Sequence, residues 1–279
     1  MLTYSAPSSW NYSSNAGIHN SHFIPNDITP WYQDGSLWDR INGINGYDEF
    51  EGIFPGCYFN INNTIRNQAE PTAYADKRII ILGCNLLTKQ GGSDNKIRYN
   101  HIVCCPYGPF GKGQMNETNT TVGGYYNSYM NTTIIGPVTN VGDSGGTINQ
   151  QLYNEFGEHL KTIKERVSDR ISETLESDII TDGSKTLGIS DRSNYYSFQA
   201  ILLSEIELYG HQAVGTYYDI GTAYLQYPVF RYNRALVDSE TWCYLRDVAN
   251  SVRFAGGTDF AGHTNSSDIR GIRPRFVLA

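Results

Sequence analysis

The apolar residues of this chain are gathered in short runs that turn-rich segments separate. Residues 79–84 and 102–105 are continuous apolar runs typical of buried strands, and residues 56–61 alternate as a half-buried strand does. A short helix is expected at about 37–42, and glycine recurs in the turn-rich stretch 106–126. Strands and helices do not alternate regularly, so we expect an α+β fold rather than a doubly wound parallel sheet.

The longest regular pattern covers residues 148–176. Apolar residues recur there at spacings of three or four, which places them on one face of a helix, while charged residues fill the other faces. The apolar positions are Leu152, Phe156, Leu160, Ile163, Val167, Ile171 and Leu175. We therefore expect one long amphipathic helix packed on a sheet, with an oligomer contact as the alternative. Thr147 or Asn149 is expected to cap it.

Composition excludes several classes of protein. The 279 residues carry 21 Lys and Arg against 28 Asp and Glu, a net charge of −7, and 13% of them are aromatic. The aromatic content argues against a disordered chain, and the acidic balance argues against binding to nucleic acid. Tyrosine, asparagine, glycine and serine are residues that binding loops favour.

The start of the chain and its cysteines bear on the compartment. Residues 1–5 lack the basic and apolar regions of a signal peptide, and no run approaches the roughly 18 apolar residues that span a membrane. We expect folding in the cytoplasm without membrane insertion. The five cysteines form no CxxC pair, and their odd number favours free, buried thiols.

Catalytic and metal motifs are weak. The segment 142–146 spells Gly-Asp-Ser-Gly-Gly, which matches the nucleophile segment of chymotrypsin-like proteases, but no earlier histidine has that family's context. A hydrolase using Ser144 is therefore kept only as an alternative. The six histidines form no HxH or HxxxH pair. Glu205 and Glu207 are expected on one face of a strand, and the sequence shows neither the second partner nor the cleft that glycosidase chemistry would need. We expect a non-enzymatic protein without metal or cofactor.

Residues 1–38 differ in character from the rest of the chain. They are rich in Ser, Asn and Pro and show no sustained period, yet they carry large rings. We interpret 1–38 as an irregular aromatic arm and 39–279 as the main domain; the alternative is that 1–38 is a loop-rich part of the same globule. The candidate docking or oligomer-contact residues are Trp10, Tyr12, Trp31, Tyr32 and Trp38.

An ordered series of segments resembles a known but uncharacterised domain family, common in gut bacteria and their tailed phages. Its members end in a Trp-x-Leu-Arg segment followed by Gly-Val-Arg-Pro-x-Phe, and the resemblance covers about 40–279. The segments are 45–59, 101–103, 115–125, 202–210, 227–230, 242–247 and 271–276.

The resemblance implies a compact, C-type-lectin-like α+β domain with short mixed or antiparallel strands and long loops. It also implies a structural protein of a tailed-bacteriophage virion (fibre, tail or head decoration) that attaches to the host surface. Partners would then be other virion proteins, further copies of the chain, with a trimer favoured, and a host glycan or protein. The alternative is a stand-alone glycan- or receptor-binding module. The calcium-site triplets Glu-Pro-Asn and Trp-Asn-Asp of sugar-binding lectins are missing, so calcium-dependent binding is not expected.

A lectin-like fold would present its ligand surface on the late loops 213–224 and 253–267. The candidate binding residues there are Tyr217, Tyr218, Tyr224, Arg253, Phe254, Asp259, Phe260 and His263. The alternative is that these loops contact other subunits or are merely exposed. The terminal motif is interpreted as scaffold, comprising Trp242, Leu245, Arg246, Arg273, Pro274 and Phe276. For Arg246, Arg273 and Arg275 a binding patch stays open as the alternative.

Overall fold

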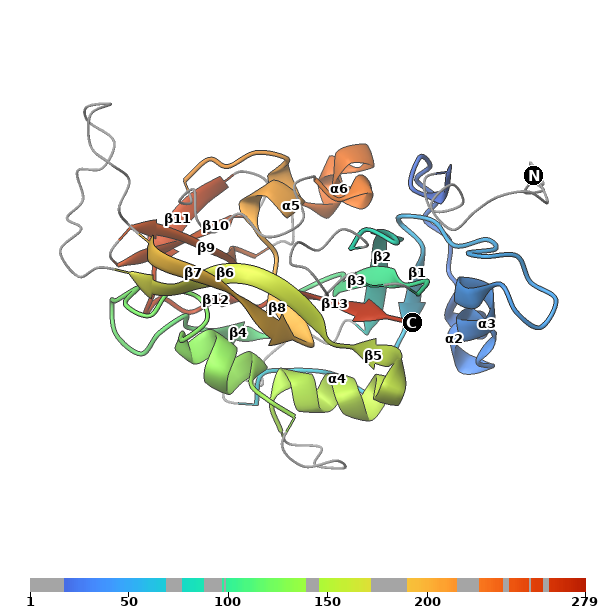
Figure 1. Cartoon of the computed structure of the whole chain (residues 1–279), viewed down its shortest axis with the longest axis horizontal. Coiled ribbons are helices and arrows are strands. Elements are labelled where there is room, and N and C mark those ends of the chain that lie inside the picture. Colours follow the sequence, from blue (N-terminus) through green and yellow to red (C-terminus); the bar gives the residue numbers. More distant parts are fainter. Residues whose placement is uncertain are drawn as a thin grey trace.

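The fold is mixed and rich in strands, as a computed structural model of the chain shows (Figure 1). The residues that the structure describes are 18–68, 77–87, 97, 99–138, 146–171, 190–214, 226–237, 241–250, 252–257 and 261–279. The expected α+β class is confirmed as a mixture of helices and mainly antiparallel strands.

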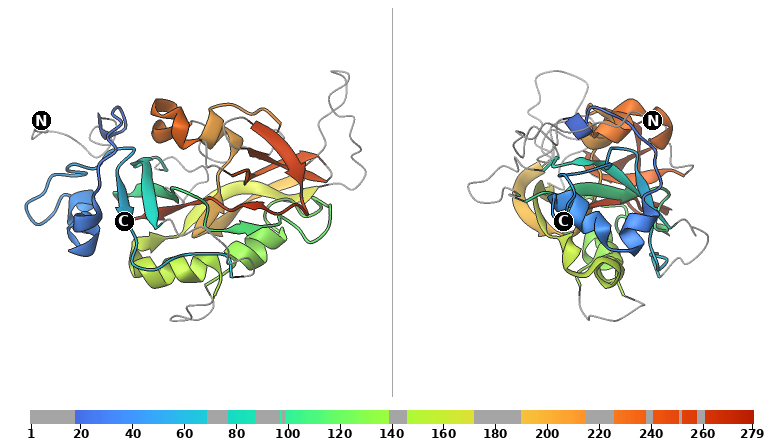
Figure 2. Two further views of the ribbon diagram at one scale, coloured as in Figure 1. Left: turned by 180° about the vertical axis from the view of Figure 1, so that it is seen from behind. Right: turned by 90° about the vertical axis from the view of Figure 1, so that its right-hand side faces the viewer.

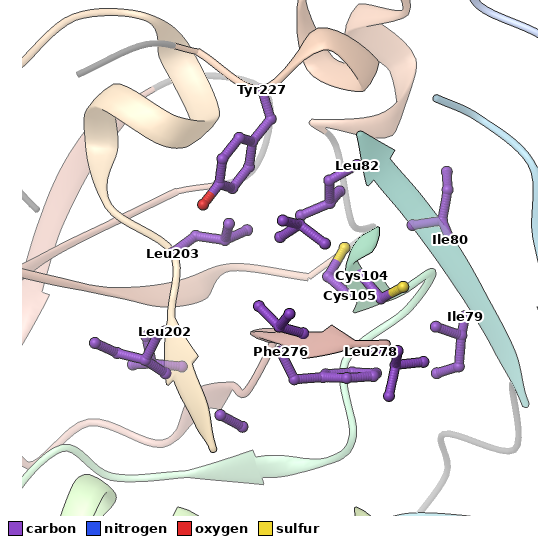
Figure 3. Packing of buried hydrophobic residues seen from close by; sticks show 14 of the residues in the cluster. Ile79, Ile80, Leu82, Cys104, Cys105, Leu202, Leu203, Tyr227, Phe276 and Leu278 are labelled. Atoms are coloured by element: carbon purple, nitrogen blue, oxygen red, sulfur yellow. The ribbon is translucent and has the colours of Figure 1, made fainter. Parts of the chain in front are cut away.

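A six-stranded sheet forms the centre of the molecule. Its strands are β1 (Tyr58–Asn60), β2 (Arg78–Cys84), β3 (Ile102–Pro106), β13 (Pro274–Leu278), β5 (Leu160–Lys161) and β8 (Ala200–Leu202). β2 and β3 are the two continuous apolar runs of the sequence, and nearly every residue in them is buried, as expected for strands covered on both faces. The close-up in Figure 3 shows Ile80, Leu82, Cys104, Leu202 and Phe276 gathered from these strands into one core.

A second sheet has the order β11-β10-β9-β12-β4 and lies toward one end of the longest axis (Figure 1). Its strands are β4 (Lys112–Gly113), β9 (Cys243–Asn250), β10 (Arg253–Gly257), β11 (Ala261–Asn265) and β12 (Arg270–Gly271). The stretch 253–267, expected as a loop, is therefore largely the antiparallel hairpin β10–β11. Arg253 pairs with Asn265, and Gly257 pairs with Ala261.

The predicted helix over 148–176 is wrong from Gly157 to Ile171, and its last part, 172–176 with Leu175, lies outside the described residues. Helix α4 covers only Ile148–Phe156 and begins at Thr147, whose side chain accepts from the Gln150 amide, so the expected N-cap is confirmed. Gly157 ends the helix at φ 55° and ψ −130°, a conformation that glycine adopts without a steric penalty. A short 3-10 turn η2 (Gly157–His159) then leads into β5.

Most of the remaining described part of that stretch is β6 (Ile163–Ile171), which pairs with β7 (Ser190–Phe198) as a two-stranded sheet. Ile163 and Val167 are four positions apart, and an even spacing places side chains on one face of a strand as well as near one face of a helix. Both are buried, and so is Glu165 between them. The spacing of the apolar residues alone could not distinguish a strand from a helix here.

The N-terminal helices α2 (Thr29–Gln33) and α3 (Ser36–Asn42) lie at the end of the longest axis opposite to hairpin β10–β11 (Figure 1, Figure 2). The short helix expected at 37–42 is confirmed by α3, so the predicted boundary between 38 and 39 falls within a helix. α2 contacts β1 of the central sheet. The described part of residues 1–38 is thus folded against the rest of the chain.

Four short helical segments complete the described structure. They are η1 (Met130–Ile135), α5 (Glu205–Tyr209), α6 (Pro228–Tyr232) and η4 (Arg234–Leu236). No helix in the described ranges has the length and apolar character needed to cross a membrane. All five cysteines are buried and unbridged, which confirms the expected free thiols.

Candidate functional site

A cleft of about 280 Å³ lies where α5, η4 and β11 come together. Its lining residues are Tyr209, His211, Ala213, Gln226, Arg234, Val237 and Ala261. Ala213 is the first residue of the loop 213–224, Gln226 lies two residues beyond its end, and Ala261 belongs to the stretch 253–267. The cleft is therefore lined by residues that belong to both predicted binding segments or flank them. Its volume is slightly below the range of about 300–1,000 Å³ found for small-molecule sites.

Helix α5 carries Tyr209 to the rim of this cleft. Ser204 caps the helix by accepting from the Glu207 amide, while the Glu207 side chain accepts from the Ser204 amide, so the two form a capping box. Gly210 ends the helix in the left-handed conformation at φ 84°. The strand predicted for Glu205 and Glu207 is therefore wrong. The spacing of Ser204 and Glu207 is the sequence signal for this helix start.

The cleft lining combines two ring systems with polar groups. The Tyr209 and His211 ring centroids are 6.5 Å apart, and His211 Nδ1 lies 3.3 Å from the Tyr209 carbonyl oxygen. Gln226 Nε2 donates to the Leu208 carbonyl at 2.8 Å, which orients its amide beside α5. Arg234 adds a guanidinium group. Rings that provide an apolar face beside a few fixed polar groups suit a small polar ligand.

A buried ionic cluster holds α5 in place from the core side. Arg246 of β9 makes a two-pronged contact with Glu207, with Nη1–Oε2 at 2.8 Å and Nη2–Oε1 at 3.1 Å. Arg275 of β13 bonds Glu207 Oε1 at 3.0 Å and also contacts Glu165 of β6 closely. All four side chains are at most 1% exposed, and their formal charges cancel.

The electrostatics of the cluster favour the charged forms. Burial tends to raise the pKa of Glu207, but the charges and hydrogen bonds of Arg246 and Arg275 outweigh it and lower this pKa to about 2. The same carboxylates raise the pKa of both arginines despite the opposing effect of their burial. Tyr227 donates to Glu207 Oε1 at 3.0 Å, and desolvation raises its phenol pKa well above its usual value. These groups are ion-paired and shielded from solvent, which suits a structural role.

Cluster and cleft share two short stretches of chain. In α5, Glu207 belongs to the cluster and Tyr209 lines the cleft; before α6, Tyr227 belongs to the cluster and Gln226 lines the cleft. The buried charges therefore anchor the segments that form one wall of the cleft. Fixed supporting residues of this kind reduce the ordering cost of binding.

The terminal motif lies mostly in the core. Leu245 and Phe276 are buried, and Pro274 is the first residue of β13. Arg273 donates to the carbonyl oxygens of Pro106 and Leu236 at 3.0 and 2.8 Å. A Cβ placed on Gly262 or Gly256 would lie within 2.7 Å of the Trp242 indole, so this ring rests on a pair of glycines in hairpin β10–β11.

Two of the predicted late-loop residues lie together on hairpin β10–β11. Arg253 Nε donates to Asn265 Oδ1 at 3.1 Å, and Arg253 Nη1 lies 2.7 Å from His263 Nε2. Phe254 is fully buried, so it cannot serve as a surface contact. The other candidates of this group, Tyr217, Tyr218, Tyr224, Asp259 and Phe260, lie outside the described residues.

The aromatic residues expected to dock the chain pack against the chain itself where they are described. The Tyr32 hydroxyl donates to Glu155 of α4 at 2.6 Å, and its ring is only 9% exposed. Trp38 stacks on His159 with ring centroids 3.8 Å apart, and Trp31 stacks on Arg40. Tyr32 is thus a core residue and offers little surface to a partner. Trp10 and Tyr12 lie outside the described part of the chain.

The described residues contain no group of three or more His, Cys, Asp or Glu side chains that could hold a metal ion. Ser144 lies in a stretch that the structure does not describe. Comparisons of the chain with known protein families, with curated proteins and with solved structures each find no match.

Proposed function

We propose that this protein is a non-enzymatic binding module that attaches to a host-surface glycan through the cleft between α5, η4 and β11. The observation that carries the proposal is the meeting of both candidate binding segments at one cleft lined by rings and polar groups. The Glu165, Glu207, Arg246 and Arg275 side chains behind this cleft are buried in ion pairs. They support the site without offering a free acid or base.

We further propose that the module is a structural component of a tailed-phage virion with a C-type-lectin-like fold. This part rests on the sequence resemblance over residues 40–279. The positions of α2 and α3 at one end of the longest axis and of hairpin β10–β11, whose Ala261 lines the cleft, at the other end suit it, because one end can attach while the other faces the host. A homo-oligomer, with a trimer favoured, belongs to this proposal, and light scattering should then give about three times 31.3 kDa.

Replacement of Tyr209 by alanine tests the binding role. The ring lines the cleft, so Tyr209→Ala should reduce adsorption of the labelled protein to host cells by about tenfold or more, since aromatic anchors dominate many interfaces. Tyr232→Ala is the matched control, because Tyr232 is 39% exposed on the neighbouring helix α6 and does not line the cleft. Equal adsorption by both variants, at unchanged melting temperature, would contradict the proposal.

Placement on a virion is tested separately. Purified phage particles from a lysate are labelled with an antibody to this chain and imaged by negative stain. Regular labelling at one position on the particles is expected. Protein that stays entirely in the unassembled fraction would instead favour a stand-alone binding module.

A further inference from the structure

Arg253 is held in a defined position by two neutral acceptors. Its Nε bonds Asn265 Oδ1 and its Nη1 bonds His263 Nε2, both across the hairpin from β10 to β11. A guanidinium group only donates, so His263 Nε2 acts as an acceptor and the ring carries its proton on Nδ1. Neither partner neutralises the arginine charge.

Two other arginines near the surface of the chain have a carboxylate partner. Arg270 lies 3.1 Å from Asp268, and Arg40 lies 3.2 Å from Glu51. No carboxylate of the described ranges lies within ion-pair distance of Arg253, although the whole chain has seven more acidic than basic side chains. Its Nη2 group donates to none of the described residues. Nη2 and the second hydrogen of Nη1 form the edge that binds oxyanions with two parallel hydrogen bonds.

This arginine lies on a face that continues from the cleft. Ala261, which lines the cleft, points to the same side of β11 as His263 and Asn265, because side chains alternate along a strand. His263 follows Ala261 by two residues, or about 7 Å along the strand. An extended ligand in the cleft can therefore reach the Arg253 guanidinium. The cleft lining itself holds Arg234 and His211 and, among the described residues, no carboxylate.

We propose that the ligand is an acidic saccharide and that Arg253, positioned by His263 and Asn265, binds its oxyanion group while the neighbouring sugar occupies the cleft. The inference rests on the proposed glycan-binding function and names the chemical class of the glycan. The oxyanion is a carboxylate, as in uronic acids, or a phosphate ester. Both are recognised by the same arginine edge.

The first test uses a glycan array of matched pairs. Oligogalacturonates are compared with their methyl esters, and phosphorylated mannose oligomers with the unphosphorylated forms. The protein should bind an acidic member about tenfold or more tightly than its neutral partner, since hydrogen bonds to charged groups are the strong ones. The carboxylate and phosphate pairs identify which oxyanion is preferred. Arg253→Gln should abolish the preference, while Arg270→Gln, which removes the same charge from a residue already paired, should keep it.

The second test does not depend on the choice of glycan. Acetate and inorganic phosphate are titrated at constant ionic strength while the NMR signals of the His263 ring are followed. A saturable shift that is lost in Arg253→Gln is expected, with the ring of exposed His22 as control. No such shift, or the same shift in Arg253→Gln, would overturn the inference.

The two tests separate failure of the inference from failure of the proposed function. Equal binding of acidic and neutral glycans would overturn the inference and leave glycan binding standing. Binding to no glycan on the array, together with an Arg253-dependent anion shift at His263, would contradict the glycan function and support the anion site.

Discussion

Arginines in two regions of this protein, the buried ionic cluster and the hairpin β10–β11, have opposite surroundings. Arg246 and Arg275 are buried and bonded to the carboxylates of Glu207 and Glu165. Arg253, on the exposed side of hairpin β10–β11, is bonded only to neutral groups among the described residues. The first arrangement satisfies its charges within the protein and fixes four elements together. The second keeps a positioned positive charge available for a ligand.

The difference shows that residue type alone does not assign a role to an arginine. A buried guanidinium left without acceptors would cost several kcal/mol. Carbonyl oxygens fill this role for Arg273, whereas Arg246 and Arg275 depend on their carboxylate partners. An exposed guanidinium carries no such penalty because water solvates it. Removing a charge from the buried cluster should therefore lower the free energy of unfolding, whereas removing the charge of Arg253 should weaken ligand binding.

The largest effect is expected for Glu207→Gln. This change leaves two buried guanidinium groups with only Glu165 as a carboxylate partner, and breaking a buried pair in this way costs about 3–5 kcal/mol in the free energy of unfolding. Urea unfolding followed by circular dichroism measures the loss. Glu51→Gln, which removes the partly exposed partner of Arg40, serves as control and should cost less than about 1 kcal/mol. Similar losses in both variants would remove the distinction between buried and exposed pairs.

Acid should weaken the same cluster. The pKa of Glu207 lies at about 2 in the folded protein against 4.5 for an ordinary glutamate, so the folded state holds this proton less tightly. The resulting stabilisation is present above pH 4.5 and is lost as the pH falls from about 4.5 to 2. Its size is on the order of 3 kcal/mol.

Urea unfolding of the wild type and of Glu207→Gln across this pH range measures the effect. The two curves should converge toward pH 2. A constant difference between them down to pH 2 would show that the Glu207 charge does not cause the stabilisation.

A smaller effect is expected at the glycine pair that supports the hairpin. In Gly262→Ala the new Cβ would lie 2.6 Å from Trp242 Cη2, so the indole or the strand must shift. Overpacking of this kind costs about 1–3 kcal/mol. Thermal unfolding reports the loss, and tryptophan fluorescence reports the altered ring. Adding Trp242→Phe, with its smaller ring, should recover part of the stability; no recovery would place the strain elsewhere.

The smallest effect on stability is expected for Arg253→Gln. The side chain is partly exposed and its partners are neutral, so the free energy of unfolding should change by no more than about 0.5 kcal/mol. A melting curve measured beside that of Glu207→Gln gives the comparison directly. If Arg253→Gln destabilised the protein as strongly as Glu207→Gln, Arg253 would be a structural residue rather than a ligand contact.

Several features of this protein follow from its sequence alone. The continuous apolar runs at 79–84 and 102–105 became β2 and β3, and Thr147 caps α4, because strand burial and helix capping depend on residues close together in the chain. The free, buried thiols also followed from an odd count of cysteines without a CxxC pair. The α+β class could be predicted because strands and helices follow one another along the chain without regular alternation.

Only the tertiary structure decided the rest. A spacing of four fits one face of a helix and one face of a strand, and pairing with β7 selected the strand for Ile163 and Val167. Glu165 and Arg275 are 110 positions apart, and no local pattern predicts that they form an ion pair. The cleft likewise unites residues from three distant segments. Periodicity reports which side of an element is apolar, whereas charge pairing and cavity shape depend on which elements the fold brings together.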